Sequence, residues 1–271
     1  MKVLVSIIVT TKNSVYTIDD FLKSIKKQTF KNIEIILVDN SSSDSTVEIT
    51  KKYTKKVFIK GPERSAQRNY GVSKSIGDFV LILDSDMVLT KDVVKECAEL
   101  ALIDKKIGGI IIPEKSFGSN FWAKVKAFER EINEGEGYFE AARFFPKKVF
   151  QEFQGYDENL TGPEDWDLPQ RISKKYKISR IKSYILHNEG KTSVINLMKK
   201  KYYYGLSADK YLSKQKMSPI SSKTLYFLRP AFYRNWKKLL SCPTLTLAMI
   251  LMLTLEMIGG GWGYLIGKFR K

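Results

Sequence analysis

Short apolar runs rich in Val and Ile alternate with longer amphipathic segments from Lys2 to about Pro113, and this alternation constrains the fold most strongly. It is the pattern of repeated strand–helix units. The runs are continuously apolar, which is typical of parallel strands covered by helices on both faces. We therefore expect an α/β fold built on a mostly parallel sheet. The predicted strands are Val3–Thr10, Ile33–Asp39, Lys56–Lys60, Phe79–Asp84 and Ile107–Pro113.

Segments with helical spacing lie between these strands. The predicted helices are Tyr16–Gln28, Ser45–Tyr53, Ser65–Ser75 and Lys91–Ile103. We expect Thr90 to cap the last helix and Asp44 or Ser43 to cap the second. In open sheets of this type ligands bind at the carboxyl ends of the strands. The residues that directly follow each strand are therefore the first candidates for chemistry.

The rest of the chain is less regular. Between residues 114 and 190 the sequence predicts a helix over Phe121–Asn133, a strand over Tyr138–Phe144 and a helix beginning near Glu164. A further helical stretch, Val194–Leu212, follows. We expect two regions: a domain over residues 1–190 and a helical C-terminal region over residues 191–271.

The positive charge of the chain is concentrated in that C-terminal region. The formal net charge is +17, yet residues 1–190 carry 31 Lys and Arg against 27 Asp and Glu, whereas residues 191–271 carry 15 against 2. A near-neutral body joined to a basic, increasingly apolar end is typical of proteins that bind an anionic membrane surface. The sequence has no zinc-finger, RNA-recognition or basic-zipper pattern, so we expect no nucleic-acid partner.

An apolar stretch over residues 239–267 is long enough to cross a bilayer, which needs about 20 residues. Gly259, Gly260 and Gly261 interrupt it, and Glu256 would be costly at bilayer depth. The sequence therefore leaves open a crossing helix, a re-entrant pair, a helix in the membrane interface and a helix packed on the main domain.

The composition excludes several other classes of protein. Hydrophobic residues make up 43% and charged residues 28% of the chain, which is typical of a folded, globular protein. Cys97 and Cys242 show no paired spacing, so we expect neither disulfides nor a cysteine metal site. The two cysteines fit a reducing compartment, and the first residues lead directly into a predicted strand, so we expect no secretory signal.

The most informative local motif is Asp84-Ser85-Asp86, which follows the buried run Phe79–Leu83. At a strand end residues i and i+2 point to the same side, so both carboxylates can bind one hard cation such as Mn²⁺ or Mg²⁺. A second acidic cluster, Glu164-Asp165-Trp166-Asp167, follows Gly162-Pro163 at a predicted helix start. These acids either interact with the helix dipole or supply a general base.

Three further positions are candidates. Asp39 ends the second strand and is placed either to bind a base or ribose or to stabilise a turn. Arg68 is placed to face a phosphate, although a surface position is the alternative. His187 is the sole histidine and is either a structural residue or a metal ligand.

Taken in order, these segments resemble glycosyltransferase family 2, whose members have the nucleotide-sugar-binding GT-A fold. The resemblance covers roughly residues 3–190 and depends on the ordered set of motifs. The matching segments are Val5–Asn13, Ile33–Asp44, Arg68–Gly71, Gly77-Asp78, Leu83–Asp86, Phe153–Glu158 and Gly162–Asp165. The Gln-x-x-Arg-Trp motif of processive polysaccharide synthases is absent, which favours transfer of a single sugar.

The resemblance assigns roles to individual residues. It implies that Thr10, Asn13, Asp39, Arg68, Asp84 and Ser85 bind a nucleotide-sugar donor, with Thr10 and Asp39 at the nucleoside. Asp84, Asp86 and His187 are the implied metal ligands. Asp165 is the implied catalytic base, and Glu164 and Trp166 are expected to support it.

The chemistry that follows is an inverting transfer without a covalent intermediate. Asp165 would accept the proton of an acceptor hydroxyl, while a metal at Asp84 and Asp86 would neutralise the departing diphosphate. The basic, Tyr-rich tail suggests a lipid-linked or other glycan acceptor at the cytoplasmic face of a membrane. The alternatives are a nucleotidyltransferase of similar fold, a non-catalytic membrane-bound scaffold and a glycoside hydrolase.

Overall fold

The computed structural model describes residues 3–136, 140–221 and 224–269. The chain divides into two compact units, which are described separately. Unit 1 comprises Met1–Glu114, Ala141–Glu158 and Glu164–Asn188, and unit 2 comprises Lys115–Glu140, Asn159–Pro163 and Glu189–Lys271. These two units do not test the predicted functional division into a domain over residues 1–190 and a C-terminal region over residues 191–271, which stays a prediction.

Unit 1 is built on a seven-stranded sheet with the order β3-β2-β1-β4-β8-β6-β9. Strands β1 to β4 are parallel, whereas β8 is antiparallel to both β4 and β6. The expected α/β fold with a mostly parallel sheet is therefore confirmed. The strands are β1 (Val5–Thr11), β2 (Ile33–Asp39), β3 (Val57–Ile59), β4 (Phe79–Asp84), β6 (Ile107–Ile111), β8 (Ala142–Pro146) and β9 (Lys177–Arg180).

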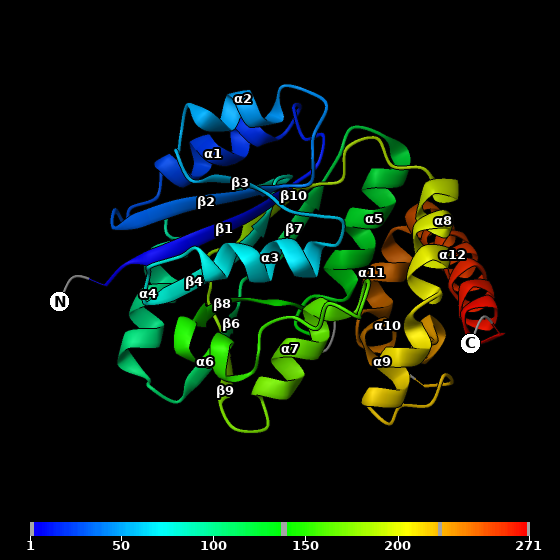
Figure 1. The fold of residues 1–271 in the computed structure, drawn as a ribbon. Coiled ribbons are helices and arrows are strands. Elements are labelled where there is room, and N and C mark those ends of the chain that lie inside the picture. The colour runs from blue at the N-terminus through cyan, green and yellow to red at the C-terminus, as the bar shows by residue number, and fades with distance from the viewer. Residues whose placement is uncertain (1–2, 137–139, 222–223, 270–271) are drawn as a thin grey trace. The chain divides into compact units, whose positions relative to one another are not determined.

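Helices cover both faces of this sheet (Figure 1). Alternate residues of β1 supply two cores, because successive side chains of a strand point to opposite faces. Ile7 and Val9 pack with α1 (Ile18–Lys26) and α4 (Val93–Ile103), whereas Ile8 packs with the helices of the other face. Those helices are α3 (Arg64–Ser73), α6 (Lys147–Glu152) and α7 (Glu164–Ile172), and α2 (Thr46–Lys51) packs beside α1.

Strand register brings the ends of three central strands to one edge. Thr10 lies opposite Asp84, and Thr11 lies opposite Asp39. Beyond this edge β5 (Met87–Leu89) pairs antiparallel with β10 (Ile185–Asn188), which places His187 opposite Met87. A histidine a hundred residues away in sequence is thereby brought beside the Asp84-Ser85-Asp86 segment.

The structure corrects two local predictions from the sequence and confirms a third. Thr90 does not cap α4, because its hydroxyl donates to the carbonyl of Tyr184. Asp44 does bind the first turn of α2, accepting from the backbone nitrogen of Thr46. The strand expected over Tyr138–Phe144 is observed only from Ala142, and residues 138 and 139 of that prediction lie outside the described residues.

Unit 2 is mainly helical. The chain enters it through β7 (Glu114–Phe117). The stretch expected as one helix over Val194–Leu212 is two, and the expected interruption at Gly259–Gly261 does not occur within the last helix. Its elements are α5 (Phe121–Ile132), α8 (Val194–Gly205), α9 (Ala208–Lys214), the 3₁₀ turn η1 (Tyr226–Leu228), α10 (Pro230–Arg234), α11 (Trp236–Ser241) and α12 (Pro243–Phe269).

Phe144 provides a test of the sheet that carries the site. It is fully buried on β8 and stacks on Phe79 with 5.1 Å between ring centroids. We expect Phe144→Ala to lower the free energy of unfolding by about 3–5 kcal/mol, through lost burial and a cavity. Urea unfolding measures the loss. Leu102→Ala, at a partly exposed position of α4, is the control and should change it by less than about 0.5 kcal/mol.

Candidate active site

The carboxyl ends of β1 and β4 form the base of the candidate site. Asp84 ends β4, and the hydroxyl of Thr10 at the end of β1 donates to its Oδ1 over 3.2 Å. Ser85 is buried and donates to the hydroxyl of Ser14 over 2.7 Å. The side chain of Ser85 is therefore directed to the loop after β1, away from the contacts of Asp84.

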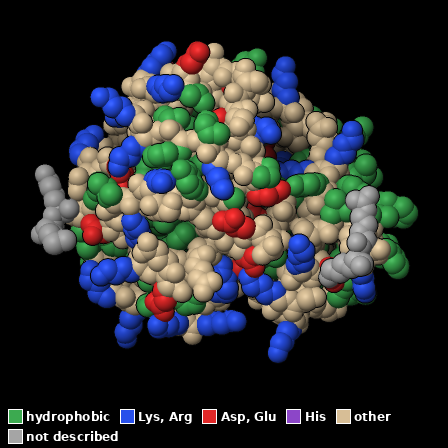
Figure 2. All heavy atoms as spheres, in the orientation of Figure 1, with side chains coloured by type: hydrophobic (Ala, Val, Ile, Leu, Met, Phe, Trp, Pro, Cys, Tyr) green, Lys and Arg blue, Asp and Glu red, His purple; other side chains and the backbone are tan. Residues whose placement is uncertain are grey.

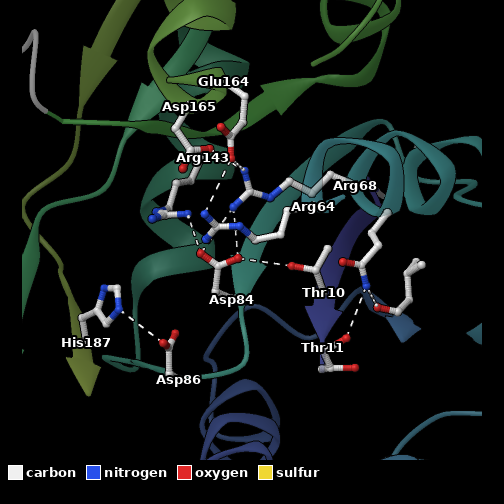
Figure 3. A network of polar contacts seen from close by, with 12 residues as sticks. Thr10, Thr11, Arg64, Arg68, Asp84, Asp86, Arg143, Glu164, Asp165 and His187 are labelled. Atoms are coloured by element: carbon white, nitrogen blue, oxygen red, sulfur yellow. Dashed lines mark hydrogen bonds and ion pairs between the residues drawn. The ribbon is translucent and has the colours of Figure 1, made fainter. Parts of the chain in front are cut away.

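Arg68 joins the two acidic motifs (Figure 3). Its Nη1 donates to Oδ1 of Asp165 over 2.6 Å, and its Nη2 donates to Asp84 over 3.0 and 3.3 Å. The Arg68 side chain is completely buried. The alternative of a surface position for Arg68 is therefore wrong, and its contact with a donor phosphate stays a prediction. The structure brings Asp84 and Asp165 together through one guanidinium, although 81 residues separate them in the chain.

Helix α3 places Arg68 there because a glycine lets the helix approach the sheet closely. A Cβ on Gly71 would lie only 2.4 Å from Cγ2 of Ile8 on β1. The Tyr156 ring lies 5.1 Å from the Arg68 guanidinium carbon. The Asn69 side chain holds the backbone of Tyr156 with two hydrogen bonds: Oδ1 accepts from the Tyr156 nitrogen, and Nδ2 donates to the Tyr156 carbonyl. The backbone of Tyr156 is thus fixed on α3.

The electrostatics of this cluster keep its central groups ionised. Burial disfavours the charge of Asp84, but Arg68 and Arg143 lower the pKa of its carboxyl far below the ordinary value. Burial likewise opposes the charge of Arg68, yet Asp165 and Asp84 raise its pKa well above normal. Each charge is stabilised by its neighbours, so the cluster depends on all its members.

Glu164 and Asp165 have different environments although they are adjacent in sequence. Asp165 is partly exposed and ion-paired with Arg68. Glu164 is buried, and one of its carboxylate oxygens, Oε2, has no hydrogen-bond partner among the described residues. Burial and the neighbouring charge of Asp165 raise the pKa of Glu164. Trp166 is half-buried in the first turn of α7.

A further series of polar contacts links Asp84 to Asp86. Arg143 on β8 lies 3.9 Å from Asp84 and donates through Nε to Glu114 over 2.6 Å. The other oxygen of Glu114 lies 3.0 Å from Nδ1 of His187. The Nε2 of His187 in turn lies 3.4 Å from Asp86 (Figure 3). The sole histidine is therefore oriented by one carboxylate and presents its other nitrogen to the second.

The donor set of Asp86 and His187 fits a divalent cation. The Oδ1 atom of Asp86 is buried and lacks a hydrogen-bond partner in the described part of the chain. An unpaired buried carboxylate oxygen beside an imidazole nitrogen matches the ligands that Mn²⁺ accepts. Within the described ranges no three acidic, histidine or cysteine side chains form a ready group of ligands. Asp84 is instead directed to Arg68.

The remaining predicted donor residues lie in the loops after β1 and β2. Asn13 has a φ of 50° and joins these loops, donating from its backbone to Ser42 and accepting from Ser43. Asp39 is fully buried and accepts from Thr11 and from both the nitrogen and hydroxyl of Ser42. These bonds match the turn-stabilising alternative for Asp39, and its contact with a nucleoside stays a prediction.

Sequence reasoning did not identify Arg143, Glu114 and Tyr156 as members of the site. Tyr156 lay within a motif of the family resemblance, so a signal for it existed. Arg143 and Glu114 stand in no recognisable motif, and a single Arg or Glu at a strand is usually a surface residue. Only the antiparallel insertion of β8 next to β4 brings Arg143 near Asp84.

Comparison with known sequences identifies the family of this chain. The family model described as Glycosyl transferase family 2 matches residues 6–156. A poly(ribitol-phosphate) β-N-acetylglucosaminyltransferase, TarS of Staphylococcus aureus, is 27% identical over 229 residues, which cover 79% of this chain and 38% of TarS. A cholesterol galactosyltransferase of Borreliella burgdorferi is 40% identical over 91 residues, 31% of this chain and 25% of that protein. This chain thus matches under two fifths of the length of TarS.

Solved structures share the fold. TarS residues 1–349 of S. aureus superpose with a TM-score of 0.57 at 18% identity, covering 94% of this chain and 81% of that one. The mannosyltransferase PcManGT of Pyrobaculum calidifontis superposes with a TM-score of 0.68 at 14% identity, covering 98% and 88%. These likenesses confirm the GT-A fold. Because the family model matches more than half of this chain, the chain belongs to glycosyl transferase family 2.

Proposed function

We propose that this chain is a metal-dependent, inverting glycosyltransferase that moves one sugar from a nucleotide-diphosphate sugar to a hydroxyl acceptor. The observation that carries the proposal is the Arg68 bridge between Asp84 and Asp165. It gathers a strand-end carboxylate suited to the donor and a partly exposed carboxylate suited to the acceptor.

The donor is proposed to bind at the carboxyl ends of β1, β2 and β4. Thr10, Asn13 and Asp39 lie in or beside the loops at this edge, where ligands of open α/β sheets bind. Related structures support a nucleotide sugar as the ligand. TarS residues 1–349 have been solved in complex with UDP, and PcManGT in complex with GDP-Man and Mn²⁺.

A divalent cation would be held by Asp86 and His187, with Asp84 beside them. When bound, such a cation neutralises negative charge that develops on the diphosphate leaving group. Glu114 holds Nδ1 of His187, which leaves Nε2 directed to Asp86. A carboxylate on the second nitrogen of a metal-binding histidine fixes its tautomer and raises its basicity. We therefore assign Glu114 as a residue that positions His187.

Asp165 is proposed as the general base. Arg68 contacts its Oδ1, so we assign proton acceptance from the acceptor hydroxyl to Oδ2. The hydroxyl oxygen then forms a bond to the anomeric carbon as the bond to the diphosphate oxygen breaks, which inverts the configuration at that carbon. Arg68 would hold the base in place while Asp84 anchors the same guanidinium.

The acceptor is proposed to be a lipid-linked or other glycan hydroxyl at a cytoplasmic membrane face. The support is the excess of Lys and Arg in residues 191–271 and the exposed apolar side chains of α12. Among the described residues α12 is the one helix long and apolar enough to cross a membrane. Helices of this kind also occur in soluble cores, so the membrane contact itself requires a test.

Removing the proposed metal ligand and the proposed base should both abolish most transfer. Base catalysis contributes about 10²–10⁴-fold, so we expect Asp165→Asn to lower kcat by that factor. Asp86→Ala should be at least as damaging, because leaving-group stabilisation and alignment supply much of the remainder. Turnover assays with separate donor-binding measurements test this. Asp20→Asn, at an exposed position of α1, is the control, and near-normal transfer by either variant would contradict its assigned role.

Glu114→Gln tests the orientation of His187. The amide keeps the shape of the side chain but removes the negative charge beside Nδ1, so we expect Mn²⁺ affinity to fall by about 10–100-fold. Electron paramagnetic resonance of free Mn²⁺ measures binding without any turnover. Glu99→Gln on α4, where the side chain is largely exposed, should bind Mn²⁺ normally. Equal Mn²⁺ affinity in both variants would contradict the assignment of Glu114 as the residue that positions His187.

Thermal unfolding identifies the donor. A ligand that binds only the native protein raises its stability, so one of UDP-, GDP- and dTDP-sugars should raise Tm most, and more with Mn²⁺ than without. Radiolabelled sugar from that donor should then appear in a lipid-extractable product when membranes are supplied. Failure of every nucleotide sugar to raise Tm would refute the proposed activity, and label confined to water-soluble glycan would refute the lipid-linked acceptor.

A further inference from the structure

The two sides of α12 have opposite environments. With 3.6 residues per turn, Leu247, Ile250, Leu251, Ile258, Trp262 and Leu265 fall on one side of the helix, and all are exposed. Met249, Met252, Leu253, Glu256, Gly259 and Gly263 fall on the other side, and all are buried within unit 2. Figure 2 shows hydrophobic side chains gathered at the right-hand edge of the view, where Figure 1 places α12.

Glycines bring the buried side of α12 against the backbone of α8. A Cβ on Gly259 would lie 2.5 Å from the carbonyl oxygen of Met198, and one on Gly263 would lie 2.1 Å from that of Tyr202. Gly267 makes the same approach to Leu206 one turn later. Glycines spaced four residues apart therefore form a flat surface on which α8 lies. Gly259, one of the glycines that suggested an interruption of the helix, instead takes part in this packing.

A buried ion pair fixes the midpoint of α12 to two neighbouring helices. Glu256 is 6% exposed, and its carboxylate lies 3.3 Å from Nζ of Lys126 on α5 and 3.7 Å from Nζ of Lys201 on α8. Lys126 also pairs with Glu129 over 3.1 Å, and Arg229 pairs with Glu129 over 3.2 Å. Burial opposes these charges, yet Lys126 and Arg229 lower the pKa of Glu129 to about 2.

These contacts argue against a membrane crossing. If α12 spanned a bilayer, Glu256 at its midpoint would lie near the hydrocarbon centre. Lys126 and Lys201 pair with Glu256 and would lie there too, where charged side chains are costly. Helix α8 also carries Lys199 and Lys200 alongside α12. A re-entrant pair is equally disfavoured, because Pro243–Phe269 is one continuous helix. A helix lying in the interface satisfies both sides at once.

We propose that α12 lies flat in the headgroup region of an anionic bilayer, with Leu247, Ile250, Leu251, Ile258, Trp262 and Leu265 inserted. This proposal rests on the membrane association proposed above. The basic excess of residues 191–271, 15 Lys and Arg against 2 acids, favours anionic lipid over a second copy of this chain, because two copies would repel each other. The exposed Trp262 ring is of the kind enriched at membrane interfaces.

The depth of insertion along α12 separates the alternatives. In the full chain with Cys242→Ser, the variants Leu247→Cys, Ile258→Cys and Leu265→Cys are labelled with a fluorophore. The fluorophore is then quenched by lipids that carry spin labels at known depths in phosphatidylglycerol vesicles. A flat helix gives three similar, shallow depths. A crossing helix gives a deep position at residue 258 and shallow positions at the ends, and that profile would overturn the proposal.

Charge substitutions on the exposed side test the lipid contact itself. We expect the double variant Leu251→Glu with Ile258→Glu to bind phosphatidylglycerol vesicles at least tenfold more weakly, as measured by flotation. Ile76→Glu, at an exposed position of unit 1, should leave vesicle binding unchanged. The proposal would be overturned in favour of a second copy of this chain by two results together. The unaltered chain would fail to bind vesicles, and it would form a dimer in sedimentation that these substitutions dissociate. Nucleotide-sugar binding is measured separately in the same proteins. Its loss would count against the proposed activity and not against the lipid contact.

Discussion

The candidate site depends on one buried guanidinium. Arg68 lies out of contact with solvent, and a charge in that position is tolerated only where opposite charges and hydrogen bonds replace water. Asp84 supplies one partner from β4 and Asp165 supplies the other from α7. The requirement to neutralise Arg68 thus holds together two motifs that folding must bring from distant parts of the chain.

The same requirement extends outward through alternating charges. Arg143 neutralises Asp84 on a second side, Glu114 neutralises Arg143, and His187 completes the sequence at Asp86. Removing one partner from a buried pair typically costs about 3–5 kcal/mol, because it leaves the other charge uncompensated. The site therefore comes at a cost to stability. In return its carboxylates keep fixed directions before any ligand arrives, which is what alignment of a donor and an acceptor requires.

Unit 2 also pairs a buried charge with opposite charges, in this case on a largely apolar helix. Glu256 stands at the middle of a long apolar helix, and Lys126 and Lys201 compensate it from two neighbouring helices. Glycines on the same side permit contact between backbones, and large apolar side chains are left on the other side. Polar pairing and glycine packing together orient α12 within unit 2, which hydropathy alone does not specify.

The sequence by itself determined the α/β class, two of the strands to the residue and the family, because hydrophobic periodicity and ordered motifs are local properties. It also selected Arg68, Asp84, Asp86, Asp165 and His187, whose proximity the structure shows, although their roles await experiment. Only the tertiary structure decided that Arg68 is buried, that Arg143 and Glu114 join the site, and which side of α12 is exposed. The physical reason is that these properties arise from pairing between distant segments, such as β8 beside β4 and α12 beside α8, and local propensity carries no record of such partners.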